Sequence, residues 1–299
     1  MEVFADLLIW CASESGSENW AQNFVTEGET NNVDVLPVTF GCDYGFRLGI
    51  GYFMCHDGWD FLASYTWYKT SGKDSIQSEG EVTSSFLGNF YINNTDGTSL
   101  GPSYRGASID WKIAFNMLDG ELGMHCCVSP CFSLRPHAGI KGGWINQSID
   151  STWSDPTEPT LTFTSASEDL TNDFWGVGPT GGLDLDWILF TPGCQTISLF
   201  NEFSGAIMYG HWDFKDQYKT DEGEKIGIKV DSIDGAATMA RDYVGLSWRW
   251  DGGCYSFALR VGYEAQIWLR QLQFYSLNYG RLDNVLTLQG GSIDFRFGF

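Results

Sequence analysis

Basic residues are scarce in this sequence: its 299 residues include 17 Lys and Arg against 38 Asp and Glu, a net charge of -21. Such a chain lacks the basic face that neutralises phosphates, which excludes a nucleic-acid partner. Long apolar runs are missing as well, because none approaches the roughly 18–20 residues that a membrane-spanning helix requires. These absences exclude a helical membrane protein but do not exclude a transmembrane β-barrel.

Glycine and aromatic residues are abundant instead: 36 Gly, 13 Trp, 13 Tyr and 21 Phe stand beside only 8 Pro. This composition is typical of a repetitive antiparallel sheet with girdles of aromatic side chains. The opening residues MEVF carry neither the basic region nor the apolar region of a signal peptide. We therefore expect the mature form of an exported chain.

Apolar residues alternate with polar or small ones over segments of about 9–11 residues, the length that a tilted strand needs to cross a bilayer. In 43–54, every even-numbered residue from Tyr44 to Met54 is apolar, whereas the opposite face carries Asp43, Arg47 and glycines. The segments with this pattern are 2–11, 43–54, 59–70, 104–117, 133–145, 174–187, 197–210, 238–250, 254–267 and 290–299. They predict one all-β domain, residues 1–299: a transmembrane antiparallel up-and-down β-barrel of about ten strands.

The connections between these segments alternate in length. The short ones are 55–58, 118–132, 188–196 and 251–253, and the long ones are 12–42, 71–103, 146–173, 211–237 and 268–289. Long extracellular loops and short periplasmic turns are typical of outer-membrane barrels, whereas a soluble sandwich has no reason to sort its connections by length. A hairpin in EVTSSFLGNFYI, residues 81–92, would raise the count to twelve strands.

Two segments fit this pattern less well. In 197–210 and 238–250 the simplest register turns Asn201 or Asp242 toward lipid, unless a β-bulge re-aims the chain. Segment 197–210 also keeps a helical alternative, because the period alone does not separate the two structures.

Four segments follow one another along the chain: 44–52 (YGFRLGIGY), 57–70 (DGWDFLASYTWYKT), 134–145 (LRPHAGIKGGWI) and 173–184 (DFWGVGPTGGLD). Together they resemble the Legionella major outer membrane protein family, whose relatives include the MOMP-like porins of chlamydia-related bacteria. The resemblance spans nearly the whole chain and implies a pore-forming, surface-exposed outer-membrane β-barrel. It supplies no catalytic residues to transfer to this sequence. The alternating Phe295, Phe297 and Phe299 at the end also resemble the signal by which the outer-membrane assembly machinery receives barrels.

The strand faces that this pattern turns inward carry charges of both signs. The predicted pore-lining residues are Arg47, Asp60, Asp110, Lys112, Arg135, Lys141, Asp184, Asp186, Glu202, Arg241, Arg260, Glu264, Asp294 and Arg296. In a wide lumen such arrays select small solutes by charge and size. In a lumen of about ten strands they would neutralise one another, because an interior of about eight strands is already filled by side chains.

The eight cysteines fall into two sets. Cys11 and Cys42 bracket the first long connection, and a disulfide between them would staple it where adjacent strands leave the bilayer. The others lie in or beside the predicted short turns: Cys55, Cys126, Cys127, Cys131, Cys194 and Cys254. They either staple turns within the chain or, as the chlamydial relatives suggest, cross-link the barrel to like neighbours or to periplasmic proteins. Their spacing lacks the paired pattern of structural zinc sites, so we expect no metal.

Connections 12–42 and 146–173 contain many carboxylates and no Lys or Arg. An acidic outer rim either attracts cations and bridges to lipopolysaccharide through divalent ions, or simply keeps the loops solvated. His211 and Asp213 are the best candidates for a hydrolytic site at the outer mouth, but no nucleophile motif accompanies them. We therefore expect no enzymatic activity and no cofactor.

The leading prediction is an outer-membrane porin that gives passive diffusion to small polar or charged solutes, with membrane lipid and lipopolysaccharide around it. The alternatives are a non-conducting structural or adhesive barrel whose acidic loops bind a partner and, last, an outer-membrane hydrolase. Contacts of a homo-oligomer would lie on the lipid-facing surface, where they look like any other apolar strand.

Overall fold

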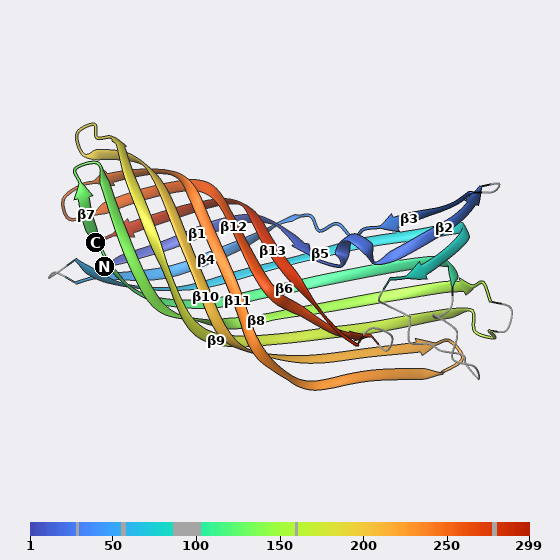
Figure 1. Cartoon of the computed structure of the whole chain (residues 1–299). Helices are drawn as coiled ribbons and strands as arrows, with labels where there is room; N and C mark the ends of the chain where they lie inside the picture. Colours follow the sequence, from blue (N-terminus) through green and yellow to red (C-terminus); the bar gives the residue numbers. More distant parts are fainter. Residues whose placement is uncertain (28–29, 55–57, 86–102, 159–160, 277–279) are drawn as a thin grey trace.

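The computed structural model describes residues 1–299 except 28–29, 55–57, 86–102, 159–160 and 277–279. Ten strands form a closed antiparallel ring (Figure 1), which confirms the predicted barrel. In ring order they are β1 (Glu2–Glu14), β4 (Cys42–Phe53), β5 (Trp59–Ser84), β6 (Tyr104–Met124), β8 (Phe132–Pro156), β9 (Ser165–Phe190), β10 (Gln195–Thr220), β11 (Lys225–Asp251), β12 (Ser256–Ser276) and β13 (Gly280–Gly298). The ring closes because β1 pairs with both β4 and β13, and the amino group of Met1 donates to the carbonyl oxygen of Phe299 at 2.9 Å.

The remaining strands lie outside this ring. β2 (Ala21–Glu27) and β3 (Thr30–Leu36) form a hairpin that pairs with the outer end of β5, and β7 (Cys126–Ser129) pairs with the start of β8. A short 3-10 helix, Ser17–Asn19, precedes β2. The ring therefore stays at ten strands and the twelve-strand alternative is wrong. Part of the hairpin expected in 81–92 lies outside the described residues, and β5 continues to Ser84.

A belt of apolar side chains runs around the outer surface of the barrel, over the part of its length that is nearer the chain termini. Leu48 and Ile50 in the middle of β4 are 51% and 56% exposed, as expected for side chains that face lipid. Aromatic residues border the belt on both sides. Those on the side away from the termini are Tyr44, Trp67, Trp144, Trp175 and Tyr209, and beyond them the outward side chains become polar, as at Asn146 and Asp173. We call the end of the barrel that holds the termini the terminal end, and the other the far end.

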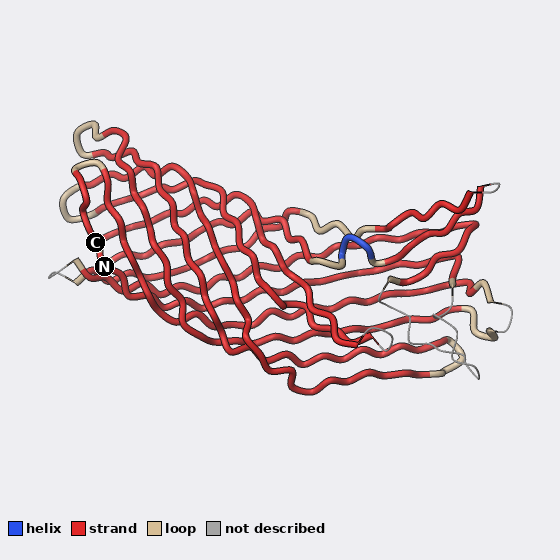
Figure 2. Tube along the Cα trace, viewed as in Figure 1, coloured by secondary structure: helices blue, strands red, loops and turns tan. Residues whose placement is uncertain are grey.

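The far end is built mostly of strand rather than loop. β9 and β10 have 26 residues each, far more than the roughly 9–11 that a bilayer crossing needs. Figures 1 and 2 show β5, β6 and β8 to β11 running well past the barrel toward the far end. The predicted long connections are therefore largely strands, and short turns such as 221–224 join them. Among the described residues, no helix is long and apolar enough to cross a membrane.

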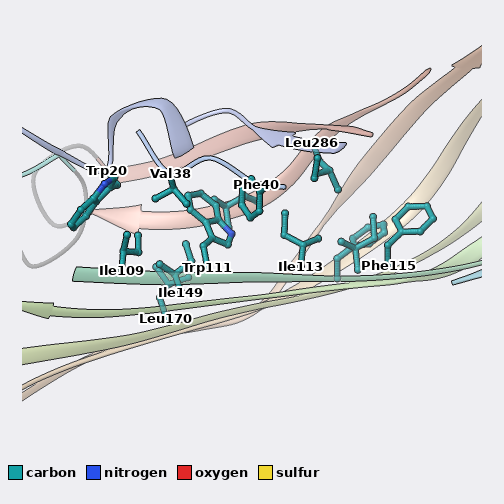
Figure 3. Close-up of a cluster of buried hydrophobic side chains, with 14 of the residues drawn as sticks. Trp20, Val38, Phe40, Ile109, Trp111, Ile113, Phe115, Ile149, Leu170 and Leu286 are labelled. Carbon is teal, nitrogen blue, oxygen red and sulfur yellow. The ribbon is translucent and has the colours of Figure 1, made fainter. Parts of the chain in front are cut away.

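An apolar core, which we call the far-end core, lies inside these far-end strands. Figure 3 shows part of it, where Trp20, Phe40, Trp111 and Ile149 gather between the hairpin side and the long strands. Trp111 and Ile149 are fully buried, and the Trp111 indole also donates to Gln147 at 3.0 Å. The far end is therefore a packed structure with its own hydrophobic stabilisation.

The two weaker segments are strands, so the helical alternative for 197–210 is wrong. Asn201 and Asp242 both lie on the outer surface, where the Asn201 amide donates to the Asp242 carboxylate at 2.6 Å. No bulge re-aims them, because the irregularities in β10 lie between Ile197 and Ser198 and between Trp212 and Phe214, on either side of Asn201. The pairing satisfies two polar groups that would otherwise face lipid alone.

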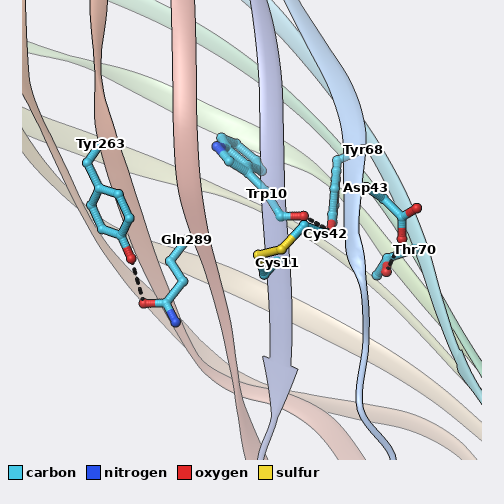
Figure 4. The surroundings of a disulfide bond; sticks show 8 residues. All are labelled: Trp10, Cys11, Cys42, Asp43, Tyr68, Thr70, Tyr263 and Gln289. Carbon is cyan, nitrogen blue, oxygen red and sulfur yellow. Dashed lines mark hydrogen bonds between the residues drawn. A yellow bond between two sulfur atoms is a disulfide. The ribbon is translucent and has the colours of Figure 1, made fainter.

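The disulfide between Cys11 and Cys42 is present and confirms that prediction (Figure 4). It joins directly paired residues of β1 and β4, whose Cα atoms are 4.0 Å apart. Beside it, the hydroxyl of Tyr68 donates to the carbonyl oxygen of Trp10 at 2.7 Å. The bond therefore closes the connection that carries β2 and β3 at the level where β1 and β4 leave the belt.

Candidate functional site: the charged lumen

Ion pairs cross the lumen at the level of the belt. Arg47 on β4 donates to Asp6 on β1 and to Glu264 on β12, each at 2.7 Å. Glu264 is fully buried and also accepts from Nε of Arg241 on β11 at 2.6 Å. One carboxylate thus joins guanidinium groups from two strands that do not pair with one another.

The same network continues toward β10 and β13. Glu202 accepts from Arg260 at 2.6 Å and from Arg241 at 3.2 Å. Asp294 accepts from Arg296 at 2.7 Å and from Arg260 at 3.3 Å. Each guanidinium therefore has at least two carboxylate neighbours, an arrangement that fixes the side chains within a narrow lumen.

A second cluster lies on the β5, β8 and β9 side. Arg135 donates to Asp60 at 2.6 Å and to Asp184 at 2.7 Å. His137 lies between Glu121 and Asp184, with nitrogen–oxygen distances of 3.3 and 3.4 Å. The strands supply these groups from alternate positions, which is why Arg135 and His137 point inward together.

Two cavities lie among these groups. The smaller, about 70 Å³, is lined by side chains from all ten ring strands and so lies in the middle of the lumen. The larger, about 420 Å³, lies toward the terminal end and is lined by acidic and basic side chains together with apolar ones such as Leu134, Leu185 and Phe200. Both touch Arg135, Asp184, Glu202 and Arg296, so the ion pairs stand between one cavity and the other.

An apolar layer closes the lumen on the far side of the network. Trp10 packs against Tyr68 and Phe115, with ring centroids 5.6 and 6.4 Å apart, and Phe115 packs against Trp268 at 5.3 Å. Trp10, Tyr68 and Trp268 are fully buried. In this conformation the lumen therefore has a charged part, then a dry aromatic part, between the terminal end and the far end.

Buried carboxyl groups lie beyond the belt, in the far-end core. Burial raises the pKa of Glu14 to about 8, although the hydrogen bond from Gln147 acts in the opposite direction. Burial likewise raises the pKa of Asp216 to about 7. Glu14 and Glu168 were expected on an acidic outer rim, but both are fully buried. The alternation of β1 and β9 turns them inward, so the rim is less acidic than the sequence suggests.

All the predicted pore-lining residues point into the lumen except Asp110 and Lys112, for which the prediction is wrong. These two lie on the outer surface of β6, where Lys112 bonds Asp110 at 3.2 Å and Asp150 at 3.1 Å. The apolar face of 104–117 packs into the far-end core and not against lipid, which turns the charged face outward.

Several lumen residues were not predicted. Asp119 and Glu121 follow on the same strand, where the inward face becomes charged at belt level, and Lys141 pairs with Asp119. Asp6 and Glu2 on β1 are further additions, and they pair with Arg47 and Arg296. The signal for Asp119 and Glu121 was available, because apolar Leu118 and Leu122 occupy the opposite parity from Phe115 and Met117.

The remaining cysteines gather at the terminal end. Cys126 is half-buried, and Cys127, Cys131, Cys194 and Cys254 are exposed; all are free thiols in the described structure. Cys55 lies outside the described residues. Turn staples within the chain are therefore absent among the described cysteines.

His211 lies on the outer surface at the far border of the belt. Its Nδ1 is 2.8 Å from Asp234, and its Nε2 is 3.8 Å from Asp213. Tyr209 donates to the same Asp234 carboxylate at 2.7 Å, and these hydrogen bonds lower the pKa of Asp234. The ring also packs near Trp175. This constellation is an interfacial hydrogen-bond cluster without a serine or cysteine nucleophile among its described contacts.

A family model described as the Legionella pneumophila major outer membrane protein precursor matches residues 2–299. None of the curated proteins compared with the chain matches it. Among solved structures, the outer membrane protease OmpT from Escherichia coli is similar at 8% identity and a TM-score of 0.37, over 100% of this chain and 97% of that one. The toluene transporter TodX from P. putida is similar at 9% identity and a TM-score of 0.31, over 100% and 90% of the two chains.

Proposed function

Because the chain belongs to the Legionella major outer membrane protein family and is an outer-membrane β-barrel, we propose that it is a gated channel for small polar or charged solutes. Transport is passive and needs no catalytic group and no cofactor. The short turns at the terminal end face the periplasm and the long strands project outside, as in other outer-membrane barrels.

The charged lumen carries this proposal. Buried ion pairs seldom stabilise a protein more than well-packed apolar side chains of similar volume, so a lumen that never admits water gains little from them. Here the ion pairs border a cavity of about 420 Å³ at the periplasmic end and a second of about 70 Å³ in the centre. These cavities support a path for water and ions through the lumen, which charged side chains block at one level but do not fill along its length.

The described conformation is closed for two reasons. Arginine and carboxylate side chains span the central cavity, and the layer of Trp10, Tyr68, Phe115 and Trp268 excludes water beyond it. A lumen of ten strands is narrow enough for side chains to block it. Conduction therefore requires a rearrangement of side chains or of a strand segment.

Single-channel recording of the refolded protein in a planar bilayer, with a salt gradient, tests the proposal. We expect infrequent openings with a defined reversal potential. Lys141→Gln, which removes a lumen cation, should shift that potential toward cation selectivity, whereas Lys112→Gln, which removes a cation from the outer surface, should not. A silent bilayer with folded protein, or equal shifts from both variants, would contradict a conducting lumen.

The second candidate is a non-conducting structural or adhesive barrel. The aromatic layer favours it, because Trp10 and Trp268 are fully buried inside the ring and both pack against Phe115. The two candidates differ in one result: a structural barrel stays silent in the bilayer even when the aromatic layer is thinned by Trp268→Ala. We propose no hydrolase function, and His211→Ala should leave any activity of the purified protein unchanged.

A further inference from the structure

The outer part of β12 leaves the barrel wall. Up to Trp268 the strand pairs regularly, with Trp268 opposite Leu286 of β13 and Leu269 opposite Thr238 of β11. The register then shifts between Trp268 and Leu272. Arg270, within the shift, has a φ of 63°, a left-handed conformation that residues with a side chain adopt rarely. The strand therefore bends sharply at Arg270.

Beyond the bend, the hairpin of β12 and β13 docks inside the lumen on β9. The side chain of Asn172 donates to the carbonyl oxygen of Gln271 at 2.9 Å and accepts from the amide of Gln273 at 3.2 Å. In the ring, β10 and β11 lie between β9 and β12, so this contact spans the interior. Leu272 and Leu286 are fully buried in the apolar core (Figure 3 shows Leu286 facing Ile113). The hairpin therefore fills the lumen just outside the aromatic layer.

The bend leaves β11 with a free edge. From Lys225 to Ala237 this strand pairs with β10 alone, and among the described residues no strand pairs with its other side. Such an edge presents unpaired amide and carbonyl groups and readily accepts another strand. Arg270 stays next to it, since its guanidinium donates to the carbonyl oxygen of Ala236 at 3.5 Å.

The docked hairpin is also imperfectly satisfied. The side-chain amide of Gln271 is fully buried, and neither its nitrogen nor its oxygen has a hydrogen-bond partner in the described part of the chain. Burying an unpaired amide is unfavourable, as is the left-handed conformation of Arg270. Both costs are removed if the hairpin leaves the lumen and β12 straightens.

We propose that the outer part of the hairpin has two docking places, the lumen and the free edge of β11, and that its transfer to the edge opens the channel. This inference rests on the proposed channel function. Continuing the register that pairs Thr238 with Leu269 places Gly235 opposite Leu272 and Asp234 opposite Gln273. The transfer exchanges the hydrogen bonds to Asn172 for main-chain bonds along β11 and moves Leu272 out of the apolar core to a place beside Gly235, on the inner side of the barrel wall.

The test uses the full chain with Cys55 and the five free cysteines of the terminal end changed to Ser, so that a cysteine placed at Leu272 is the only thiol outside the disulfide of Cys11 and Cys42. Reaction of Leu272→Cys with a membrane-impermeant maleimide reports release of the hairpin. We expect slow reaction in the parent background and, because Asn172→Ala removes two hydrogen bonds, a rate about tenfold higher with it. Asn201→Ala removes an amide from the outer surface and should leave the rate unchanged. Heat-dependent gel mobility confirms that each variant is folded.

A second measurement leaves Asn172 intact. In the cysteine-to-serine background with Leu272 retained, Asp234→Cys with Gln273→Cys should form a disulfide only when the hairpin lies on β11. The oxidised protein should then conduct until the disulfide is reduced. Failure of this disulfide to form, or an Asn172→Ala rate equal to the parent's, would overturn the two docking places even if the channel conducts. A cross-linked hairpin in a silent bilayer would instead overturn the channel function.

Discussion

Replacing Glu264 with Gln tests whether the charged lumen acts as one network. The carboxylate is fully buried and accepts from Arg47 at 2.7 Å and from Arg241 at 2.6 Å. Removing one partner of a buried ion pair typically costs about 3–5 kcal/mol. Arg47 keeps Asp6 and Arg241 keeps Glu202, so neither guanidinium is stranded. We therefore expect a loss at the lower end, about 3 kcal/mol of the free energy of unfolding.

The loss is measured by urea unfolding in lipid vesicles, followed by tryptophan fluorescence and by gel mobility. The matched control is Asp231→Asn, which breaks the pair of Lys229 and Asp231 on the exposed surface of β11. That pair should contribute less than about 1 kcal/mol, because exposed ion pairs are screened by water. Both variants change one carboxylate to its amide, so their difference reports the burial of Glu264 together with its larger number of partners. A Glu264→Gln barrel within about 0.5 kcal/mol of the parent would refute the network.

Four further predictions follow from the described contacts. Cys11→Ser with Cys42→Ser should cost about 4 kcal/mol in urea unfolding, the loop entropy for a sequence separation of 31, and equal stability with and without reductant in the parent would contradict this. Leu48→Arg, at the centre of the belt, should cost about 2–4 kcal/mol in vesicles, and a neutral effect would argue against lipid contact. Glu14 should stabilise the fold fully below its ordinary pKa and lose that contribution as pH rises through a pKa of about 8, because the folded state holds the proton of Glu14 more tightly. Glu14→Gln should flatten the pH dependence of the urea midpoint, and an unchanged pH dependence would exclude this contribution of Glu14. Finally, the free thiols of the terminal end should give disulfide-linked oligomers on a non-reducing gel of native outer membranes, where monomer alone would contradict cross-linking.

The strand count was predictable because successive side chains of a strand point alternately to lipid and to the interior, so apolar residues recur at every second position. Each of the ten segments falls on its own ring strand, and three of them extend one or two residues beyond it: 43–54, 254–267 and 290–299. Even the polar Asn201 and Asp242 face outward as the simplest register requires. Alternation alone, however, does not say which face is inside. At 104–117 the apolar face packs around Trp111 in the far-end core, so the face with Lys112 points out.

The sequence does mark where the apolar face switches from the outside of a strand to the inside. Where a strand leaves the belt, its apolar residues move from the outer to the inner face, and two apolar residues then stand side by side. Met117 is buried and Leu118 is 52% exposed; Phe174 is buried and Trp175 is 47% exposed. Such adjacent pairs mark the outer border of the belt and identify the sequence beyond it as strand rather than loop. The bend at Arg270 has no comparable signal, because it depends on contacts with β9 far along the chain.

The long paired arms at the far end limit where this surface accepts change. Beyond the belt, β10 stays paired with β11 as far as Lys219, and a residue inserted within the arms would shift the pairing and turn buried side chains outward. Only the tips escape this constraint, as at Gly223, whose φ of 94° lies in the turn between the two strands. Foreign peptides displayed on the cell surface, or natural variation in length, therefore belong at these tips, while the arms change in composition but not in length.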